Sequence, residues 1–368
     1  KKSKKKKTGK KLKKFDDWNE YHGASEGSGR SEKYWLEKEI NGKKLIGLFK
    51  YNKSNDTTEH ISEQVASVIG SKIGIKTAQI DIGFHNGRVG SMSYLINSHN
   101  ENLIEGVNLI TRYFTSYNSE LLFDEETKEY YSLSMILSSI TVLGLSHKFN
   151  SFRKKIFEMM IFDFLIGNSD RHHSNWGILE SDNKVEFSPL YDNGSSLCCY
   201  ILENRIGNFF GTDKQPLLAQ VTTKSKSRIR IDGSIKKEPL HQDVVALLIE
   251  NYLADVGELI NRIISDMDDD FIGQLLDAYP NHILSDNKKR LIKTFLHMKV
   301  NLLKELVMKH GSTGLYNAFV LKSESDSSNT ITHKHISKFD LKNTHEFIRI
   351  RKDNINNSLK FNKGRRLE

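Results

Sequence analysis

The sequence is poor in the residues that mark disulfide-rich or irregular proteins. Only two of its 368 residues are cysteines, and these are the neighbours Cys198 and Cys199. Because a disulfide between adjacent residues is strained, we expect no disulfide framework and a reducing compartment such as the cytoplasm. Proline is also scarce, with four in the chain. Proline breaks helix interiors, so its scarcity favours long helices.

Long apolar runs are missing as well. The longest, from Ile156 to Gly167, is too short to cross a bilayer and contains Glu158 and Asp163. The N-terminal lysines are not followed by the apolar segment of a secretory signal peptide. We therefore expect no transmembrane segment and no signal peptide. Hydrophobic residues still make up 37% of the chain and aromatic residues 10%, which excludes wholesale disorder.

Excess positive charge is confined to the N-terminus. The formal net charge is +9, and residues 1–14 contain ten lysines and no acidic residue, so the remainder is close to neutral. We expect residues 1–14 to form a flexible, solvated tail. Such a tail could also bind nucleic acid, an anionic membrane or an acidic partner, or act as a localisation signal.

The hydrophobic pattern predicts an α+β protein in several parts. Residues 15–98 predict a small lobe in the order strand, strand, helix, strand, strand. Residues 99–345 are mostly helical, and residues 346–368 form a polar extension. Residues 224–234, rich in lysine, arginine and serine, predict an exposed loop. The helices of the larger lobe are expected at Tyr131–Leu145, Arg153–Ile166, Asp243–Ile264, Asp270–Tyr279 and Lys289–Lys309.

The segment GNSDRHHSNWG, residues 167–177, concentrates polar side chains after a helix that is apolar on nearly every side. A buried helix provides a rigid base for the loop that follows it. We expect a strand after this loop, a turn at Asp182 and a second strand that ends at Asp192. Such a hairpin returns the chain to its starting point. It can therefore bring Asp170, Asn175 and Asp192 together.

These three residues fit the chemistry of phosphoryl transfer. That reaction needs a carboxylate for the attacking hydroxyl and oxygen ligands for magnesium. Protein kinases place their catalytic base and a metal-binding asparagine in the pattern D-x-x-x-x-N, and Asp170 and Asn175 have this spacing. Asp192, followed by Asn193 and Gly194, then takes the place of the second metal-binding residue. The pattern predicts a nucleotide-dependent kinase site.

Other roles for this segment need separate consideration. A zinc site at His172 and His173 would need further ligands that the sequence does not supply at suitable spacing. We expect one of the two histidines to support the loop through a hydrogen bond. Asp163 is expected to be a satisfied structural carboxylate. Arg171 could contact a phosphate or be an ordinary exposed arginine.

The small lobe offers the second half of such a site. Gly27 and Gly29 belong to a small-residue loop whose backbone could approach phosphates, and Lys50 ends a strand. A Walker A motif is excluded because Arg30 stands where lysine is needed and no buried strand precedes the loop. Glu63 could pair with Lys50, although helical projection leaves open whether it faces a second layer or water. By position, an adenine-binding hinge is expected around Ser93, Tyr94 and Leu95.

The segments GRSEKYWL, LFK, SEQVASVIGSKIGI, GNSDRHHSN and PLYDNGSSL occur in the order found in one known family. Over roughly residues 20–300 the chain resembles the HipA-like serine/threonine kinases, and most of all their short members of the cell-translocating (CtkA) type. The resemblance implies a bilobal protein-kinase-like fold that uses ATP and Mg²⁺. It implies Asp170 as the base, Asn175 and Asp192 on magnesium, Lys50 on phosphates and Glu63 as the helix glutamate. Further nucleotide contacts implied are Ser28, Gly29, Arg30, Ser31, Glu32, Lys33, His172, His173, Ser174 and Tyr191.

We therefore expect an ATP- and magnesium-dependent kinase of serine or threonine in a protein substrate. The family is known for toxins silenced by phosphorylation of the glycine-rich loop, which predicts autophosphorylation at Ser25, Ser28 or Ser31. Longer members carry an extra N-terminal subdomain for their antitoxin; here a lysine tail precedes the kinase core, so an antitoxin partner is not expected. Secretion into host cells is a family trait of the short members. The alternatives are a lipid or small-molecule kinase, because DRHxxN also resembles phosphatidylinositol kinases, and a non-catalytic nucleotide- or nucleic-acid-binding regulator.

Overall fold

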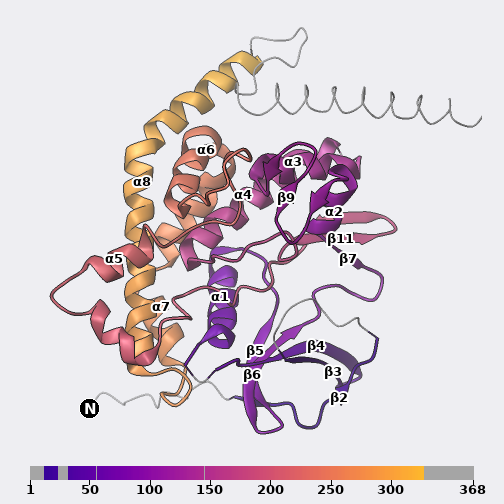
Figure 1. The fold of residues 1–368 in the computed structure, drawn as a ribbon, viewed down its shortest axis with the longest axis vertical. Helices are drawn as coiled ribbons and strands as arrows, with labels where there is room; N and C mark the ends of the chain where they lie inside the picture. Colours follow the sequence, from indigo (N-terminus) through magenta and orange to yellow (C-terminus); the bar gives the residue numbers. More distant parts are fainter. Residues whose placement is uncertain (1–11, 24–31, 55, 145, 327–368) are drawn as a thin grey trace, which may run out of the picture.

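Two lobes of unequal size form the protein. The computed structural model describes residues 12–23, 32–54, 56–144 and 146–326. A curved sheet and one helix make the smaller lobe, and helices dominate the larger one (Figure 1). Residues 95–101 connect the last strand of the small lobe to the first strand of the large lobe. This connection lies at the predicted hinge.

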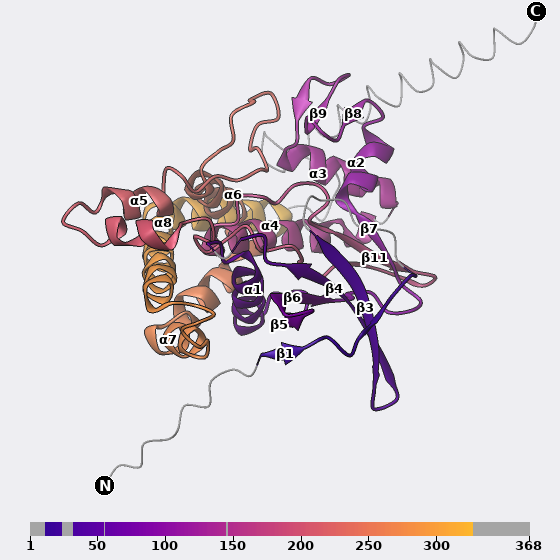
Figure 2. The ribbon, with the colours of Figure 1, turned by 60° about the horizontal axis from the view of Figure 1, so that its bottom comes forward.

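The small lobe is built on an antiparallel sheet with one parallel edge. Six strands of the described chain form it, in the order β1-β5-β6-β4-β3-β2, with β1 parallel to β5 (Figure 2). An aromatic cluster that includes Phe15, Trp18 and Phe49 is buried against the sheet. The strands are β1 (Lys13–Lys14), β2 (Asn19–Glu20), β3 (Lys33–Ile40), β4 (Lys43–Tyr51), β5 (Ile80–His85) and β6 (Arg88–Tyr94).

Helix α1 (Glu59–Ile73) is enclosed on two sides. One side packs on β5 and β6 and the other on α6 of the large lobe. Gln64 donates to the carbonyl oxygen of Ile80 at 2.9 Å and accepts from the Tyr279 hydroxyl at 2.7 Å. Glu63 is 3% exposed. Of the two positions that helical projection left open for Glu63, the enclosed one is correct.

The large lobe has one extended core and a smaller apolar cluster around Ile206, Phe209 and Leu291. Helix α4 is buried from Ile156 to Ile166 and contacts α3, α6 and α8. Helix α8 runs along the side of the lobe against α6 (Figure 1). The helices are α2 (Gly106–Tyr113), α3 (Leu133–Ile140), α4 (Phe149–Ile166), α5 (Gln215–Val221), α6 (His241–Asp266), α7 (Asp269–Asp277) and α8 (Asp286–Asp326), with 3₁₀ turns at Thr141–Leu143, Ser146–Lys148 and Glu203–Phe209.

Two small sheets complete the described part of the large lobe. The predicted hairpin is present as β11 (Gly177–Ser181) and β12 (Lys184–Phe187), and β7 (Asn102–Glu105) pairs with β11 as a third strand. Strands β8 (Tyr117–Asn118), β9 (Phe123–Asp124) and β10 (Glu129–Tyr130) form the other sheet. Strands this short carry too little alternation to be recognised in a sequence.

Several predicted boundaries need correction. Lys13 and Lys14 do not belong to a free tail, because they form β1 and Lys13 pairs with Asp81 at 2.6 Å. The second hairpin strand ends at Phe187, so an irregular segment carries Asp192. The rest of the lysine tail, the loop at residues 24–31 and the polar extension at 346–368 lie outside the described residues.

No helix within the described ranges has the length and apolar character needed to span a membrane.

Candidate active site

The end of helix α4 sets the start of the predicted catalytic loop, residues 168–175. Gly167 adopts a left-handed φ of 66°, which terminates the helix, and a β-carbon there would lie 2.6 Å from the Phe295 ring. The loop then folds on itself. The Asp170 amide donates to Asn168 Oδ1 at 3.0 Å, and Asn175 Nδ2 donates to the Asp170 carbonyl oxygen at 2.8 Å. These bonds fix the distance between the two residues that the spacing singled out.

Arg171 anchors this loop from the interior of the protein, beneath the cavity side. Its side chain is 1% exposed, so the prediction of an exposed or phosphate-binding arginine is wrong. Nη2 donates to Asp163 Oδ1 at 2.8 Å and to Asn193 Oδ1 at 2.5 Å, and Nε also donates to the Asp163 carboxylate. Nη1 donates to the carbonyl oxygens of Asn175 and Tyr191 at 2.8 and 2.9 Å. The arginine therefore joins the catalytic loop to the segment that bears Asp192.

Asp163 has the structural role that we predicted. Burial raises the pKa of its carboxyl, while the Arg171 guanidinium opposes that shift. Buried charges need a paired and hydrogen-bonded partner, and here the two groups supply that for each other. The pair supports the site from the protein interior, and neither residue lines the cavity.

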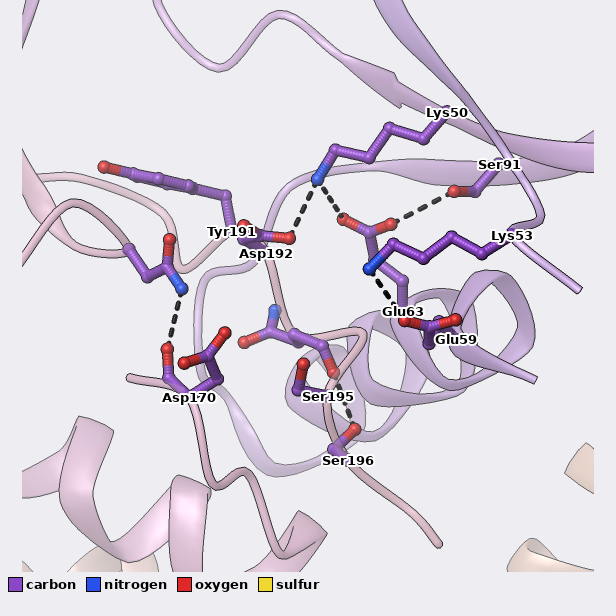
Figure 3. Close-up of polar contacts among 12 residues, drawn as sticks. Lys50, Lys53, Glu59, Glu63, Ser91, Asp170, Tyr191, Asp192, Ser195 and Ser196 are labelled. Carbon is purple, nitrogen blue, oxygen red and sulfur yellow. Dashed lines mark hydrogen bonds and ion pairs between the residues drawn. The ribbon is translucent and has the colours of Figure 1, made fainter. Parts of the chain in front are cut away.

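Asp192, Lys50 and Glu63 connect the two lobes across the cavity (Figure 3). Lys50 Nζ lies 2.8 Å from Asp192 Oδ1 and 3.6 Å from Glu63 Oε1. The Ser91 hydroxyl donates to Glu63 Oε2 at 3.1 Å. Asp192 itself has a φ of 55°, a left-handed conformation that costs free energy in a residue other than glycine. The surrounding contacts therefore hold Asp192 in a strained backbone position.

The electrostatics of this network are mutually supportive. Burial tends to lower the pKa of Lys50, but the carboxylates of Asp192 and Glu63 outweigh it and raise that pKa. The nearby ammonium of Lys50 lowers the pKa of Asp192, whereas burial raises the pKa of Glu63. At neutral pH the network presents a charged lysine and an ionised Asp192 to the cavity.

A cavity of about 660 Å³ lies between the lobes at this network. That volume is in the usual range for a small-molecule or cofactor site. The predicted residues that line it are Lys33, Lys50, Glu63, Ser93, Tyr94, Leu95, Asp170, His172, Ser174, Asn175, Tyr191 and Asp192. The structure thus brings together side chains that are up to about 160 residues apart in the sequence.

Two predicted nucleotide contacts lie elsewhere. His173 is absent from the lining, because its ring is buried against Tyr117, whose hydroxyl lies 2.9 Å from His173 Nδ1. Both histidines make hydrogen bonds in the loop, because the Ser174 amide donates to His172 Nδ1 at 3.2 Å. Glu32 is exposed and pairs with Arg88 at 2.7 Å. The other loop positions, including Ser28, Gly29, Arg30 and Ser31, lie outside the described residues.

Sequence reasoning missed the apolar wall of the cavity. Trp35, Leu48 and Leu103 line it, together with the carboxylate Glu105. Alternation along the strands is the signal that would have found two of these. Leu48 precedes Lys50 by two residues and so lies on the same face of the sheet, and Trp35 is the cross-strand partner of Leu48. Leu103 and Glu105 lie on β7, a strand that was not predicted. A flat base would pack against a wall of this kind.

The chain belongs to the HipA-like family. A family model described as the HipA-like C-terminal domain matches residues 22–256, which is more than half of the chain. The chain is also 23% identical over 263 residues to the serine/threonine-protein kinase CtkA of Helicobacter pylori, over 65% of this chain and 75% of that protein. The resemblance inferred from the sequence motifs is confirmed.

A solved structure supports the same fold. The crystal structure of the H. pylori proinflammatory kinase CtkA matches with a TM-score of 0.66 and 19% identity, and covers 81% of this chain and 99% of that one. The α+β, bilobal kinase-like fold expected from the sequence is therefore confirmed. HipA from Shewanella oneidensis, solved in complex with HipB and operator DNA, matches with a TM-score of 0.44 and 13% identity over 77% of this chain and 66% of that one.

Proposed function

We propose that the protein is an ATP- and magnesium-dependent kinase that phosphorylates serine or threonine in a protein substrate. One observation carries the proposal: Asp170, Asn175 and Asp192 line the same inter-lobe cavity as Lys50, which contacts Asp192 at 2.8 Å. Kinases need a base, metal-binding oxygens and a phosphate-binding lysine in one cleft. The name of the relative CtkA, a serine/threonine-protein kinase, supports the same activity.

Each side chain has a defined task in this reaction. The Asp170 carboxylate accepts the proton of the acceptor hydroxyl, whose oxygen then forms a bond to the terminal phosphorus of ATP. The bond from that phosphorus to the bridging oxygen breaks, and ADP leaves. Lys50 neutralises charge on the nucleotide phosphates, and Glu63 keeps the Lys50 ammonium in place through the contact at 3.6 Å. Trp35 and Leu48 provide the apolar surface for the base.

The available oxygens fit a magnesium ion. Asn175 commits its amide nitrogen to the Asp170 carbonyl oxygen, which leaves its side-chain oxygen as an acceptor. Asp192 uses Oδ1 for Lys50 and has a second carboxylate oxygen. Carboxylate and amide oxygens are the ligands that this hard cation prefers, so Asn175 and Asp192 would hold it. Bound there, magnesium supplies neutralisation of the phosphate charge.

Labelled ATP tests the proposal directly. We expect the purified protein with magnesium to label itself or a general protein substrate on serine or threonine, and Asp170→Asn to reduce the labelling by roughly 10³-fold. Labelling of phosphoinositide vesicles without any protein labelling would instead identify a lipid kinase. A third outcome would identify a regulator: no phosphate transfer, together with nucleic-acid binding that is lost on removal of residues 1–11 and is unchanged by Asp170→Asn. This deletion retains β1.

Autophosphorylation of the glycine-rich loop is part of the proposal. Ser25, Ser28 and Ser31 are the candidate acceptors. A phosphate dianion in this loop would compete with the nucleotide phosphates for the same donors and so silence the enzyme. Mass spectrometry after long incubation with ATP should find one of these serines modified. Unmodified serines in an otherwise active enzyme would reject this form of regulation.

A further inference from the structure

The loop between α5 and α6 is rich in basic residues and places one of them, Arg228, at the catalytic loop. Residues 222–240 contain six lysines and arginines but only Asp232 and Glu238 as acids. The other residues between 15 and 326 carry a formal net charge of −11, so this local positive excess stands apart from its surroundings. Arg228, at the middle of the loop, lies with Nη2 at 3.5 Å from Asp170 Oδ1. A cation is therefore placed directly at the proposed base.

The backbone around Arg228 is firmly held. Its neighbours Ser227 and Ile229 are buried, and the Ser227 amide donates to the Pro239 carbonyl oxygen at 3.0 Å. Arg230, 7% exposed, donates through Nη1 to the Arg228 carbonyl oxygen at 3.0 Å and through Nη2 to the Lys236 carbonyl oxygen at 3.0 Å. A recognition side chain on such a preorganised segment loses little entropy on binding.

The guanidinium of Arg228 does not use all of its hydrogen-bond donors. Nη1 donates to Glu238 at 2.9 Å, whereas the contact of Nη2 with Asp170 is an ion pair at 3.5 Å, too long for a good hydrogen bond. Nε is buried and has no hydrogen-bond partner among the described residues, so Nη2 is the donor that a substrate can reach. Arg171, by contrast, commits all of its nitrogens. Arg228 Nη2 can donate a charge-assisted hydrogen bond to a carboxylate.

The position of Arg228 separates acceptor from nucleotide. Asp170 lines the inter-lobe cavity, but Arg228 does not and contacts Asp170 from outside it. The acceptor hydroxyl must reach Asp170 opposite the nucleotide phosphates, since attack and departure are roughly in line. Arg228 is therefore on the side from which the acceptor enters. Lys50 and the cavity wall serve the nucleotide side.

We propose that Arg228 binds an acidic side chain of the substrate close to the acceptor hydroxyl, so that the enzyme selects serine or threonine flanked by aspartate or glutamate. This inference rests on the proposed kinase function and names its substrate class. A substrate carboxylate at Arg228 Nη2 replaces the ion pair with Asp170. The Asp170 carboxylate is then free to accept the hydroxyl proton, so an acidic substrate also completes the site.

Paired peptides test this inference. Each pair carries one serine and differs only by glutamate or glutamine at one flanking position. We expect the wild-type protein to favour glutamate at one position by about tenfold in kcat/KM, mainly through KM, as a single charge-assisted contact allows. Arg228→Gln should reduce this ratio to about one. Arg228→Lys, which keeps the positive charge but lacks the planar guanidinium, should retain part of the preference for glutamate.

Lys226→Gln is the matched control, because it removes the same charge from the same loop and Lys226 makes no ion pair within the described part of the chain. The control should keep the wild-type ratio. If Arg228→Gln lowers kcat equally for both peptides and leaves the ratio intact, Arg228 acts on the transferring phosphoryl group or on the loop structure, and the specificity proposal is overturned. A ratio near one in the wild-type protein overturns it as well.

Peptide binding separates this inference from the kinase assignment. Fluorescence polarisation with the full chain should show tighter binding of the glutamate peptide than of the glutamine peptide, and Arg228→Gln should remove the difference. Absence of phosphate transfer to every peptide, with this binding difference present, would reject the kinase function alone. Transfer without any binding preference would reject the acidic recognition site alone.

Discussion

Two polar networks meet at the catalytic loop, and they differ in how completely their atoms are used. Under the loop, Arg171 is buried and all its nitrogens donate to Asp163, Asn193 or carbonyl oxygens. On the cavity side, Lys50 contacts Asp192 and Glu63, while Glu63 Oε1 and the Tyr191 hydroxyl lack a hydrogen-bond partner among the described residues. The first network is saturated and the second has unused capacity.

This difference indicates that the saturated network has a structural role and that the cavity-side network has a binding role. A saturated buried network is costly to disturb and has nothing left to bind a ligand. Buried polar atoms without partners cost free energy unless a ligand satisfies them, so they are found where ligands bind. Changes under the loop should therefore reduce stability, and changes in the cavity should reduce binding or turnover.

The largest effect should come from Asp170, which belongs to the cavity side. Asp170→Asn keeps the size of the side chain but removes the proton acceptor. We expect phosphate transfer to fall by roughly 10³-fold, within the range for general-base catalysis, with nucleotide affinity and unfolding midpoint little changed. Steady-state kinetics and denaturant unfolding measure both. A comparable loss of stability would place Asp170 in the structural network instead.

Asp163→Ala tests the network under the loop. The substitution leaves the Arg171 charge buried without its carboxylate, which should cost about 3–5 kcal/mol of the free energy of unfolding. Urea denaturation measures the change. Asp163→Asn, which preserves shape and one acceptor oxygen, should lose less. Stability equal to wild type in Asp163→Ala would show that the two networks do not differ as described.

Lys50→Met tests the binding role of the network on the cavity side. Without the ammonium, nucleotide phosphates lose a charge-assisted contact, and we expect affinity to fall by about tenfold. Because the Lys50 charge is the main cause that lowers the pKa of Asp192, that pKa should rise in the variant. Titration with a fluorescent nucleotide measures the affinity. Lys44→Met, on the same strand but paired with Glu37, is the control and should bind normally.

Mild acid should destabilise the protein through one histidine at the cavity and one in the catalytic loop. Burial lowers the pKa of His60, which lines the cavity, and of His173, which packs against Tyr117, from 6.5 to about 4. Between pH 6.5 and about 5.5 the unfolded chain binds protons that the folded chain does not, so stability falls with pH, by about 1 kcal/mol for each histidine. Thermal melting across this window measures the slope.

Single variants separate the two contributions. His60→Gln and His173→Gln should each flatten the dependence of stability on pH, because glutamine does not titrate. His173→Gln should also lower stability at neutral pH, since it disturbs the bond to the Tyr117 hydroxyl, whereas His60 Nδ1 has no partner to lose among the described residues. An unchanged slope in both variants would contradict the assignment.

Motif spacing was sufficient to predict that Asp170, Asn175 and Asp192 lie close together. The interval from Asp170 to Asn175 and the hairpin before Asp192 are local features, and the structure places these residues on one cavity. His173 and Glu32 show where the reasoning was too coarse: adjacency to a motif does not decide which way a side chain faces. Arg171 was misjudged for the same reason, since burial depends on what packs over a residue.

The sequence by itself determined the buried helix α4, the loop chemistry that follows it and the α+β order of elements, because periodicity and short-range spacing are written in adjacent residues. Only the tertiary structure decided the ion pairs of Lys50 with Asp192 and of Arg228 with Asp170, each of which joins residues far apart in the chain. It also decided that Glu63 is enclosed, because Ser91 of β6 and Lys50 of β4 contact its carboxylate. Contacts of this kind depend on how whole elements pack, and no local pattern specifies that packing.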